Sequence, residues 1–331
     1  MSQQDALLCF LVRSGGCVSG EEMSRALGVT RAAVWKGIEA LRGAGYEIAS
    51  VPGQGYRLES CPNRLSAGAI SARLAPEAAV GREIVCLEQV DSTNTYLKRR
   101  GAEGGAHGLA ALAEEQTGGR GRRGRRFESP KGAGLYLSVL LRPDCAPAEA
   151  VTLTAWVGVA VCDAVEQAAG VRPRIKWTND IILNGKKLCG ILTEMSVEGE
   201  TGAVDYVVAG MGTNVGETAE YFAQAGLADI ATSLDIEGHA VDRNVLAACL
   251  LNALDRMAKE FPQEKGKWLK QYRADCLTPG HEVKLVGPEG ERRAEALAID
   301  DDFGLVVALP DGTTETITAG EVSVRGIAGY V

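Results

Sequence analysis

The sequence has little of what marks a metal-binding or disulfide-linked protein. Its three histidines, His107, His239 and His281, are far apart and lack the short spacing of metal ligands, so we expect no structural zinc. The nine cysteines are odd in number and widely spread, and no two of them form a C-x-x-C pair. This pattern is typical of reduced, mostly buried thiols, and it favours a cytoplasmic location.

Long uninterrupted apolar runs are also lacking. Residues 6–12 form a short apolar run that follows Asp5 without a basic leader, so they predict a first helix and not a signal peptide. The longest apolar stretch, residues 151–169, contains Asp163 and Glu166, which a membrane span would tolerate poorly. We therefore expect no membrane segment.

The composition is otherwise that of an ordinary globular protein. Of 331 residues, 46% are hydrophobic and 24% are charged, and only 11 are proline. This length suggests two or three domains with a large core. The net charge of -8 argues against bulk coating of nucleic acid, although it leaves room for a local basic face.

One stretch departs from this acidic background. Residues 118–127, GGRGRRGRRF, which we call the arginine loop, alternate glycines with five arginines: Arg120, Arg122, Arg123, Arg125 and Arg126. Glycines let a backbone approach a ligand closely, and consecutive N–H groups together with arginines can hold an anion. By itself, the string is compatible both with a phosphate-binding loop and with a solvated basic run or a nucleic-acid patch.

The first 60 residues have the pattern of a winged helix-turn-helix. Helices are predicted over residues 4–13, 19–27 and 31–42, the second of them opened by a capping box of Ser19 and Glu22. Strands at 46–51 and 55–59 form the wing. The exposed face of the third helix and the wing would meet DNA through these residues: Thr30, Arg31, Ala32, Trp35, Lys36, Gln54 and Arg57. The alternative is a small interaction domain that never contacts DNA, in which Trp35 belongs to the core.

The central part mixes strands, hairpins and helices. Helices are predicted at residues 66–74, 151–169 and 244–261, and one more starts at the sequence DSTN (91–94), with Ser92 or Thr93 as its N-cap. The dipeptide Asn184-Gly185 predicts a two-residue hairpin. Strands are predicted at residues 83–90, 109–115, 134–141, 175–177, 181–183, 188–195 and 206–212. Since strands outnumber helices and include hairpins, we expect a mixed α+β sheet and not a doubly wound parallel one.

The last part of the chain is predicted to be all β. A final central helix at residues 268–274 precedes the breaker Leu277-Thr278-Pro279-Gly280. Five short strands then follow, at residues 282–286, 292–299, 305–309, 315–318 and 322–325. Five strands within about 50 residues predict a small barrel.

Five motifs occur in order behind the winged helix: STN (92–94), EQTGGRGRRGR (115–125), KWTND (176–180), KKLCGIL (186–192) and GMGTNV (210–215). In this combination the chain resembles the bifunctional biotin-protein ligase and biotin-operon repressor family over essentially its whole length. Two positions depart from the family pattern. Thr178 stands where the family usually has proline, and Phe127 stands where tryptophan is frequent.

The resemblance implies three domains: a winged helix-turn-helix at 1–62, a ligase domain at 63–276 with a fold like that of class II aminoacyl-tRNA synthetases, and an SH3-like barrel at 277–331. It also implies two-step acyl transfer. Biotin and ATP, with Mg²⁺ on the phosphates, give biotinyl-AMP, and a lysine of a biotin carboxyl carrier protein then attacks this anhydride. Lys187 and Arg122 would be the catalytic cations. No protein side chain is expected to act as nucleophile, and Cys189 is expected only to pack.

The resemblance also assigns binding residues. Biotin would be bound by Ser92, Thr93, Asn94, Gln116, Gly119, Arg120, Gly121, Arg122, Lys187, Gly190 and Gly210. ATP and the adenylate would be bound by Arg120, Arg122, Phe127, Lys176, Asn179, Asp180, Lys187, Asn214 and Arg325. Arg123, Arg125 and Arg126 are expected in solvent or against a second copy.

The same resemblance implies that adenylate-bound dimers repress transcription at operator DNA. Two alternatives remain open at this point. One is a ligand-sensing DNA-binding regulator without ligase activity, and the other is a lipoate-type protein ligase on the same fold.

Overall fold

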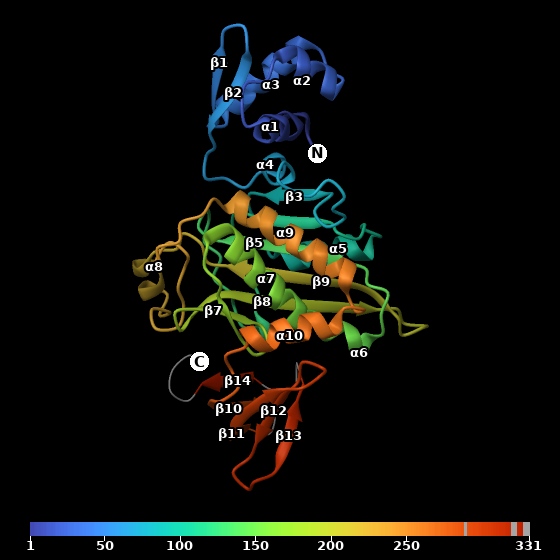
Figure 1. Ribbon diagram of the computed structural model, residues 1–331, viewed down its shortest axis with the longest axis vertical. Helices are drawn as coiled ribbons and strands as arrows, with labels where there is room; N and C mark the ends of the chain where they lie inside the picture. Colours follow the sequence, from blue (N-terminus) through green and yellow to red (C-terminus); the bar gives the residue numbers. More distant parts are fainter. Residues whose placement is uncertain (288–289, 319–322, 327–331) are drawn as a thin grey trace.

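The structure is a computed structural model that describes residues 1–287 and 290–318 and the backbone of residues 323–326. The molecule is elongated, with the N-terminal helices at one end, a central sheet with its helices in the middle and the C-terminal strands at the other end (Figure 1). The arginine loop belongs to the central part, where it runs from β4 (Ala110–Ala113) to β5 (Leu135–Leu141).

The N-terminal part has the predicted order of elements: α1 (Gln3–Ser14), α2 (Gly20–Leu27), α3 (Arg31–Gly43), β1 (Glu47–Val51) and β2 (Gly55–Ser60). Ser19 caps α2 by accepting from the backbone N–H of Glu22, but the reciprocal bond of the predicted capping box is not formed. The complete capping box lies instead at the start of α1, between Ser2 and Asp5. Trp35 is 55% exposed, so its alternative assignment to the core is wrong.

A short helix joins this module to the central domain. α4 (Ala67–Ser71) is shorter than the predicted 66–74 and packs against α1 on one side and α9 (Arg243–Glu260) on the other. Ala69 belongs to the apolar core of the N-terminal module, and its neighbour Ile70 belongs to that of the central domain. The two cores therefore meet at α4.

The central domain contains a seven-stranded sheet in the order β3-β4-β5-β9-β8-β7-β6. The pair β3–β4 is parallel and the other pairs are antiparallel, which confirms the predicted mixed sheet. The remaining strands are β3 (Ile84–Leu87), β6 (Arg174–Lys176), β7 (Asp180–Leu183), β8 (Lys186–Val197) and β9 (Val204–Thr213). Between β7 and β8, Asn184 and Gly185 both have positive φ, as the predicted two-residue turn requires.

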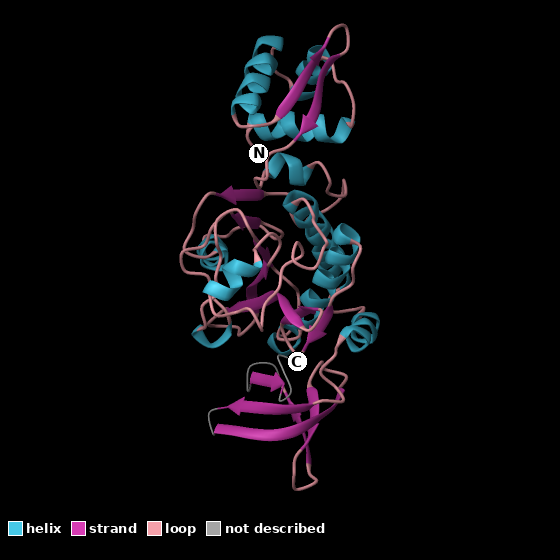
Figure 2. Ribbon diagram, turned by 90° about the vertical axis from the view of Figure 1, so that its left-hand side faces the viewer, coloured by secondary structure: helices cyan, strands magenta, loops and turns pink. Residues whose placement is uncertain are grey.

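Helices cover both faces of this sheet (Figure 2). α7 (Leu153–Ala169) and α9 pack on one face against Leu112, Val139 and Val207, and α5 (Thr93–Ala102) packs on the other against Ala111 and Val208. The alternation follows from the two-residue period of strands. The other helices are α6 (Pro147–Ala150), α8 (Ala219–Gln224) and α10 (Lys265–Asp275), of which α6 and α8 were not predicted. By length and composition the segment Pro147–Ala169 would be sufficient to cross a membrane, but 72% of its apolar window is buried inside the protein, as is typical of a core helix.

The C-terminal strands form an antiparallel sheet in the order β13-β12-β11-β10-β14. They are β10 (Glu282–Gly287), β11 (Gly290–Ile299), β12 (Leu305–Ala308), β13 (Thr314–Ile317) and β14 (Ser323–Gly326), close to the predicted bounds. Their buried side chains continue the core of the central domain. The turn between β11 and β12 takes part as well, since Phe303 lies edge-to-face with Tyr272 of α10 at 5.4 Å between ring centroids.

Candidate active site

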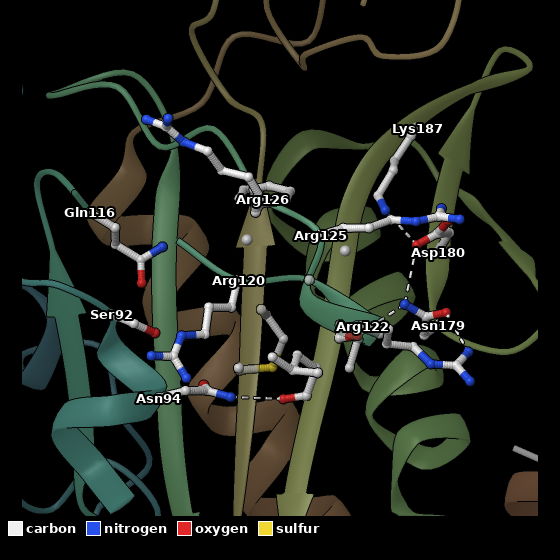
Figure 3. Close-up of a pocket in the computed structure, with 18 of the residues that line it drawn as sticks. Ser92, Asn94, Gln116, Arg120, Arg122, Arg125, Arg126, Asn179, Asp180 and Lys187 are labelled. Carbon is white, nitrogen blue, oxygen red and sulfur yellow. Dashed lines mark hydrogen bonds and ion pairs between the residues drawn. The ribbon is translucent and has the colours of Figure 1, made fainter. Parts of the chain in front are cut away.

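A pocket lies where α5 begins, between the arginine loop and strands β7, β8 and β9. It gathers side chains from all the motifs that the sequence singled out, except that GMGTNV contributes only its first three residues. Most of its labelled side chains fall into two groups (Figure 3): Ser92, Asn94, Gln116 and Arg120 lie at one end, and Arg122, Arg125, Asn179, Asp180 and Lys187 lie at the other, with Arg126 between them.

The end of the pocket that holds Arg120 is otherwise uncharged, and it is built on the first residues of α5. Ser92 occupies the N-cap position, but its hydroxyl does not cap the helix and makes no hydrogen bond to a described residue. Thr93 donates to Gln116 Oε1 from its backbone N–H at 2.9 Å and from its hydroxyl at 3.1 Å. Gln116 in turn donates to Ser129 Oγ at 3.0 Å. Gln116 is therefore held at both ends of its amide, and the Ser92 hydroxyl is one polar group left open to a ligand.

Two glycines allow close approaches that a side chain would prevent. A Cβ on Gly210 would lie 2.0 Å from Asn94 Oδ1, and a Cβ on Gly212 would lie 2.5 Å from the Phe127 ring. Phe127 therefore packs directly on the backbone of β9, beside Gly190 of β8. The departure from tryptophan at this position keeps an aromatic ring over the sheet.

The arginine loop folds back on itself. Gly121 donates to the carbonyl of Arg125 at 2.7 Å, and Phe127 donates to the carbonyl of Gly119 at 3.0 Å. One turn of 3₁₀ helix, Arg122–Gly124, forms its tip, and Arg123 there has a φ of 56°. Gly119 has no positive φ. It is required because a Cβ would lie 2.3 Å from the carbonyl oxygen of Phe127.

Charged groups meet at the other end of the pocket. Lys187 Nζ lies 2.6 Å from Asp180 Oδ1, and Arg122 donates to Asn179 Oδ1 at 3.1 Å. Asn179 is held in turn by donating to the carbonyl of Ile191 at 3.0 Å. Burial lowers the pKa of Arg122, and its neighbours Arg123 and Arg125 lower it further, whereas Asp180 opposes the shift. Lys176 is only 6% exposed and also lines the pocket.

Most of the predicted site residues are brought together here. The pocket is lined by Ser92, Thr93, Asn94, Gln116, Arg120, Gly121, Arg122, Phe127, Lys176, Asn179, Asp180, Lys187, Gly190 and Gly210. Gly119 and Asn214 do not line it. Asn214 lies behind Lys187 and donates to the carbonyl of Thr232 at 2.8 Å, because its side chain points into the following loop. Arg325 lies on β14 opposite Lys284, and its side chain is outside the described part of the chain.

The other three arginines are exposed, as expected. Arg125 and Arg126 also line the pocket, which was not expected. Arg123 is exposed but donates to the carbonyl of Val286 in β10 at 2.8 Å. The loop is therefore in contact with the C-terminal strands.

Sequence reasoning missed two residues that support the pocket floor. Ser138 of β5 is completely buried beneath Thr93 and Asn94, and Glu194 of β8 contacts the amide of Asn94. Neither residue lies within one of the five motifs. Ser138 is a serine in an apolar strand, and Glu194 lies in a stretch whose sequence suggests exposure to solvent. Cys189 is buried, as its expected packing role requires, and burial raises its pKa to about 12.

The predicted DNA-facing residues lie on α3 and on the wing of the N-terminal module. All seven of them are exposed: Thr30, Arg31, Ala32, Trp35, Lys36, Gln54 and Arg57. Arg31 forms an ion pair with Glu21 of α2, and Arg57 forms one with Glu59. Both pairs are exposed, so they are worth little and can be exchanged for phosphate contacts. Among the described residues, no group of three or more His, Cys, Asp or Glu side chains is arranged to hold a metal ion.

Comparisons with known proteins match each part of the chain. Residues 86–214 match the model of the biotin/lipoate A/B protein ligase family, residues 3–57 match a helix-turn-helix domain, and residues 278–325 match the biotin protein ligase C-terminal domain. The chain is 34% identical to the bifunctional ligase/repressor BirA of Bacillus spizizenii over 96% of this chain and 97% of that protein. It is also 34% identical to the BirA of Escherichia coli over 96% of each chain.

A solved structure agrees with these matches. The biotin protein ligase of Aquifex aeolicus in complex with biotin and ATP superposes with a TM-score of 0.61 and 30% identity, and it covers 74% of this chain and 99% of its own. Matches over nearly the full length at this identity, with all three domains in the same order, leave one assignment: the chain belongs to the family of bifunctional biotin ligase/repressors.

Proposed function

We propose that this protein activates biotin as biotinyl-5'-AMP, transfers it to a lysine of a biotin carboxyl carrier protein, and represses transcription through its N-terminal module. The observation that carries the ligase assignment is the division of one pocket into two ends. Uncharged donors and acceptors at Ser92, Asn94 and Gln116 suit the ureido ring of biotin. Cations at Arg122 and Lys187 suit a carboxylate and a phosphate that must meet.

The first step joins two anions. The carboxylate oxygen of biotin attacks the α-phosphorus of ATP, and the bond from that phosphorus to the bridging oxygen of pyrophosphate breaks. Repulsion between the carboxylate and the phosphate opposes this approach, so positive charge fixed beforehand at the meeting point lowers the barrier. Lys187, held in place by Asp180 at 2.6 Å, and Arg122, held by Asn179 at 3.1 Å, supply that charge.

The second step needs exclusion of water. The amine of the carrier lysine attacks the carbonyl carbon of the mixed anhydride, AMP leaves, and the amine loses a proton. Water would hydrolyse the same anhydride, so the arginine loop must cover it. The loop is suited to this role, because Arg122 fastens it to Asn179 and Phe127 packs against Gly212.

The pocket side chains alone would not complete a Mg²⁺ site, so the ion would bind together with the phosphates of the nucleotide. Asp180 is the one carboxylate among the described lining residues, and Mg²⁺ commonly uses one or two carboxylates plus substrate phosphates. Asp180, with the amide oxygen of Asn179, would therefore hold the ion against the phosphates. When bound, it would neutralise phosphate charge and the leaving pyrophosphate.

For the repressor role we keep the division into residues 1–62, 63–276 and 277–331. The N-terminal module would place α3 in the major groove of operator DNA and its wing on the backbone. Dimerisation promoted by the adenylate would bring two such modules to two half-sites. The N-terminal part is not strongly basic, so a single copy would bind DNA weakly.

Labelled biotin tests the enzymatic proposal directly. Incubation with Mg-ATP and a biotin carboxyl carrier protein should give label on the carrier that depends on every component. Calorimetric titration with biotin, then with biotin and Mg-ATP, should show binding followed by a much tighter complex. Label transfer that fails with biotin but succeeds with lipoate would select the lipoate-type alternative, and binding without transfer would select the non-enzymatic regulator.

An Arg31→Ala variant tests the DNA-facing surface. Arg31 is exposed at the start of α3, so its loss should weaken operator binding about tenfold at low salt while leaving ligase activity unchanged. Gel-shift titrations with the adenylate-bound protein measure this. Unchanged operator affinity would mean that α3 does not contact DNA through this residue.

A further inference from the structure

The side-chain amide of Asn94, at the floor of the pocket, is held by hydrogen bonds at both its nitrogen and its oxygen. Its Nδ2 donates to the carbonyl of Leu192 at 3.1 Å and to Glu194 Oε2 at 3.0 Å. Its Oδ1 lies 2.6 Å from the hydroxyl of Ser138. An amide nitrogen has two protons and can only donate, and both protons of Asn94 are used by these two acceptors.

The other orientation of this amide is unfavourable. If the side chain were flipped, its oxygen would face the Glu194 carboxylate and the Leu192 carbonyl, neither of which can donate. A buried acceptor left without a donor costs about 1–3 kcal/mol. Asn94 is only 4% exposed, so water cannot easily replace the lost partners.

Glu194 is itself held in its ionised form. Its second oxygen, Oε1, accepts from Lys98 Nζ of α5 at 2.7 Å. Burial would raise the pKa of Glu194, but hydrogen bonds from Lys98 and Asn94 and the charges of Lys98 and Arg120 outweigh it, and the pKa is lowered. The carboxylate therefore remains an acceptor at neutral pH.

The hydroxyl of Ser138 completes the arrangement from below. It is completely buried on β5 and also lies 2.7 Å from Thr93 Oγ1, from which it can accept while the backbone N–H of Thr93 keeps its bond to Gln116 Oε1. Because Asn94 Oδ1 can only accept, Ser138 gives its single proton to that oxygen. One lone pair of Oδ1 then remains as the unused hydrogen-bonding capacity of Asn94 within the described part of the chain. It can serve only a ligand that donates.

From this geometry we propose that Glu194 and Ser138 are positioning residues that fix Asn94 as a hydrogen-bond acceptor and so select acids whose ring carries an N–H group. A cyclic urea provides such a donor, whereas the dithiolane or alkyl chain of lipoate-like acids does not. The inference rests on the proposed function, because it concerns how the same pocket distinguishes biotin from other acids. It assigns a role to two residues outside the pocket lining.

The test compares biotin with its two carbamate analogues, in each of which one ureido N–H is replaced by oxygen. Calorimetry without ATP should show that the wild-type protein prefers biotin to at least one analogue by about tenfold or more, the value of one hydrogen bond in a buried site. In Glu194→Ala and in Ser138→Ala, biotin should bind about five- to tenfold more weakly. The preference for biotin over that analogue should fall towards unity in both.

Two further variants distinguish a loss of Asn94 positioning from a general loss of structure in the protein. Glu194→Gln keeps an acceptor oxygen for Asn94 Nδ2, so it should retain most of the preference. Glu198→Ala, in the exposed turn after β8, should behave as wild type. Thermal melts of all variants check that they fold.

The outcomes distinguish this inference from the proposed function. A preference that stays at its wild-type value in both alanine variants, while biotin still binds, would overturn the positioning role alone. A wild-type protein that binds none of the three compounds would overturn the proposed function, and this inference with it.

Discussion

Lys187→Met tests whether the charged end of the pocket supports adenylation. Lys187 is the second residue of β8, its ammonium lies 2.6 Å from Asp180 Oδ1, and its side chain is 26% exposed. Its backbone is fixed independently, since its N–H donates to the carbonyl of Ile230 and its own carbonyl accepts from Thr232. Methionine has a similar length and no charge, so the substitution removes the cation with little change in packing.

The expected loss follows from the chemistry of the first step. Removing one donor placed in advance at a developing charge typically costs about 3–4 kcal/mol, which corresponds to roughly 10²- to 10³-fold in rate. The variant also leaves Asp180 without its partner beside the incoming phosphates, which adds repulsion.

Biotin-dependent exchange of pyrophosphate into ATP measures the first step, and single-turnover transfer from preformed biotinyl-AMP to the carrier measures the second. Lys187→Met should slow exchange more than transfer. Lys186→Met is a matched control, because Lys186 donates to the carbonyl of Ala228 outside the pocket and should leave exchange unchanged. Exchange within threefold of wild type in Lys187→Met would refute the assignment of this lysine to the reacting groups.

Three further predictions concern a close contact, a buried ion pair and a buried carboxyl. Gly210→Ala places a Cβ 2.0 Å from the amide oxygen at the pocket floor and should weaken biotin binding by calorimetry on the order of tenfold or more, whereas Gly199→Ala, with nothing within 4 Å, should not. Arg243→Met breaks a 2.8 Å pair with Glu114, both nearly inaccessible, and should destabilise the protein to denaturant by about 3–5 kcal/mol, partly restored by Glu114→Gln. Burial raises the pKa of Glu217 from 4.5 to about 6, so the folded state favours the protonated carboxyl. The free energy of unfolding should therefore fall by about 2 kcal/mol as the pH rises through the range between these two pKa values. Thermal melts of Glu217→Gln at the same pH values should lack that fall.

The sequence predicted the order of elements well because local patterns determine them. The Asn184-Gly185 turn and the apolar faces of α3 and α9 follow from propensity and periodicity, and all of them are present. The shortening of β3 to Ile84–Leu87 was not predictable, because a strand ends where its partner ends, and β4 supplies only four residues for pairing. The helix α8 was missed because its six residues have too little periodicity to detect.

The pocket was predictable only as far as its motifs extend. Resemblance identified Lys187, Arg122 and Gln116, but it could not show which of their neighbours would turn towards them. Asn214 belongs to the same motif as Gly210 and yet points behind Lys187, because it follows the last residue of β9 and its amide donates to the carbonyls of Lys187 and Thr232. Ser138 and Glu194 reach Asn94 from strands 44 and 100 residues away along the chain, and nothing in their local sequence indicates that contact.

The arginine loop carries the clearest difference between pattern and structure. From sequence it was a choice between an anion-binding loop and a basic patch, with its outer arginines assigned to solvent. In the structure, adjacent arginines point to different parts of the protein: Arg122 to Asn179 in the pocket, and Arg123 to the carbonyl of Val286 in the C-terminal sheet. The positive φ of Arg123 makes this divergence possible, because it reverses the direction of the chain between the two side chains.

The C-terminal domain meets the pocket at a second point, the turn between β11 and β12, where the indole N–H of Trp177 donates to the carbonyl of Phe303 at 2.8 Å. Trp177 stands between Lys176 and Asn179, so the segment that receives Arg122 is itself held by the same domain that receives Arg123. The arginine loop and the segment 176–180 that it contacts are therefore both hydrogen-bonded to the C-terminal domain. Any ligand that orders the arginine loop over the pocket must then stabilise that domain as well, since the contacts that fix the one also fix the other.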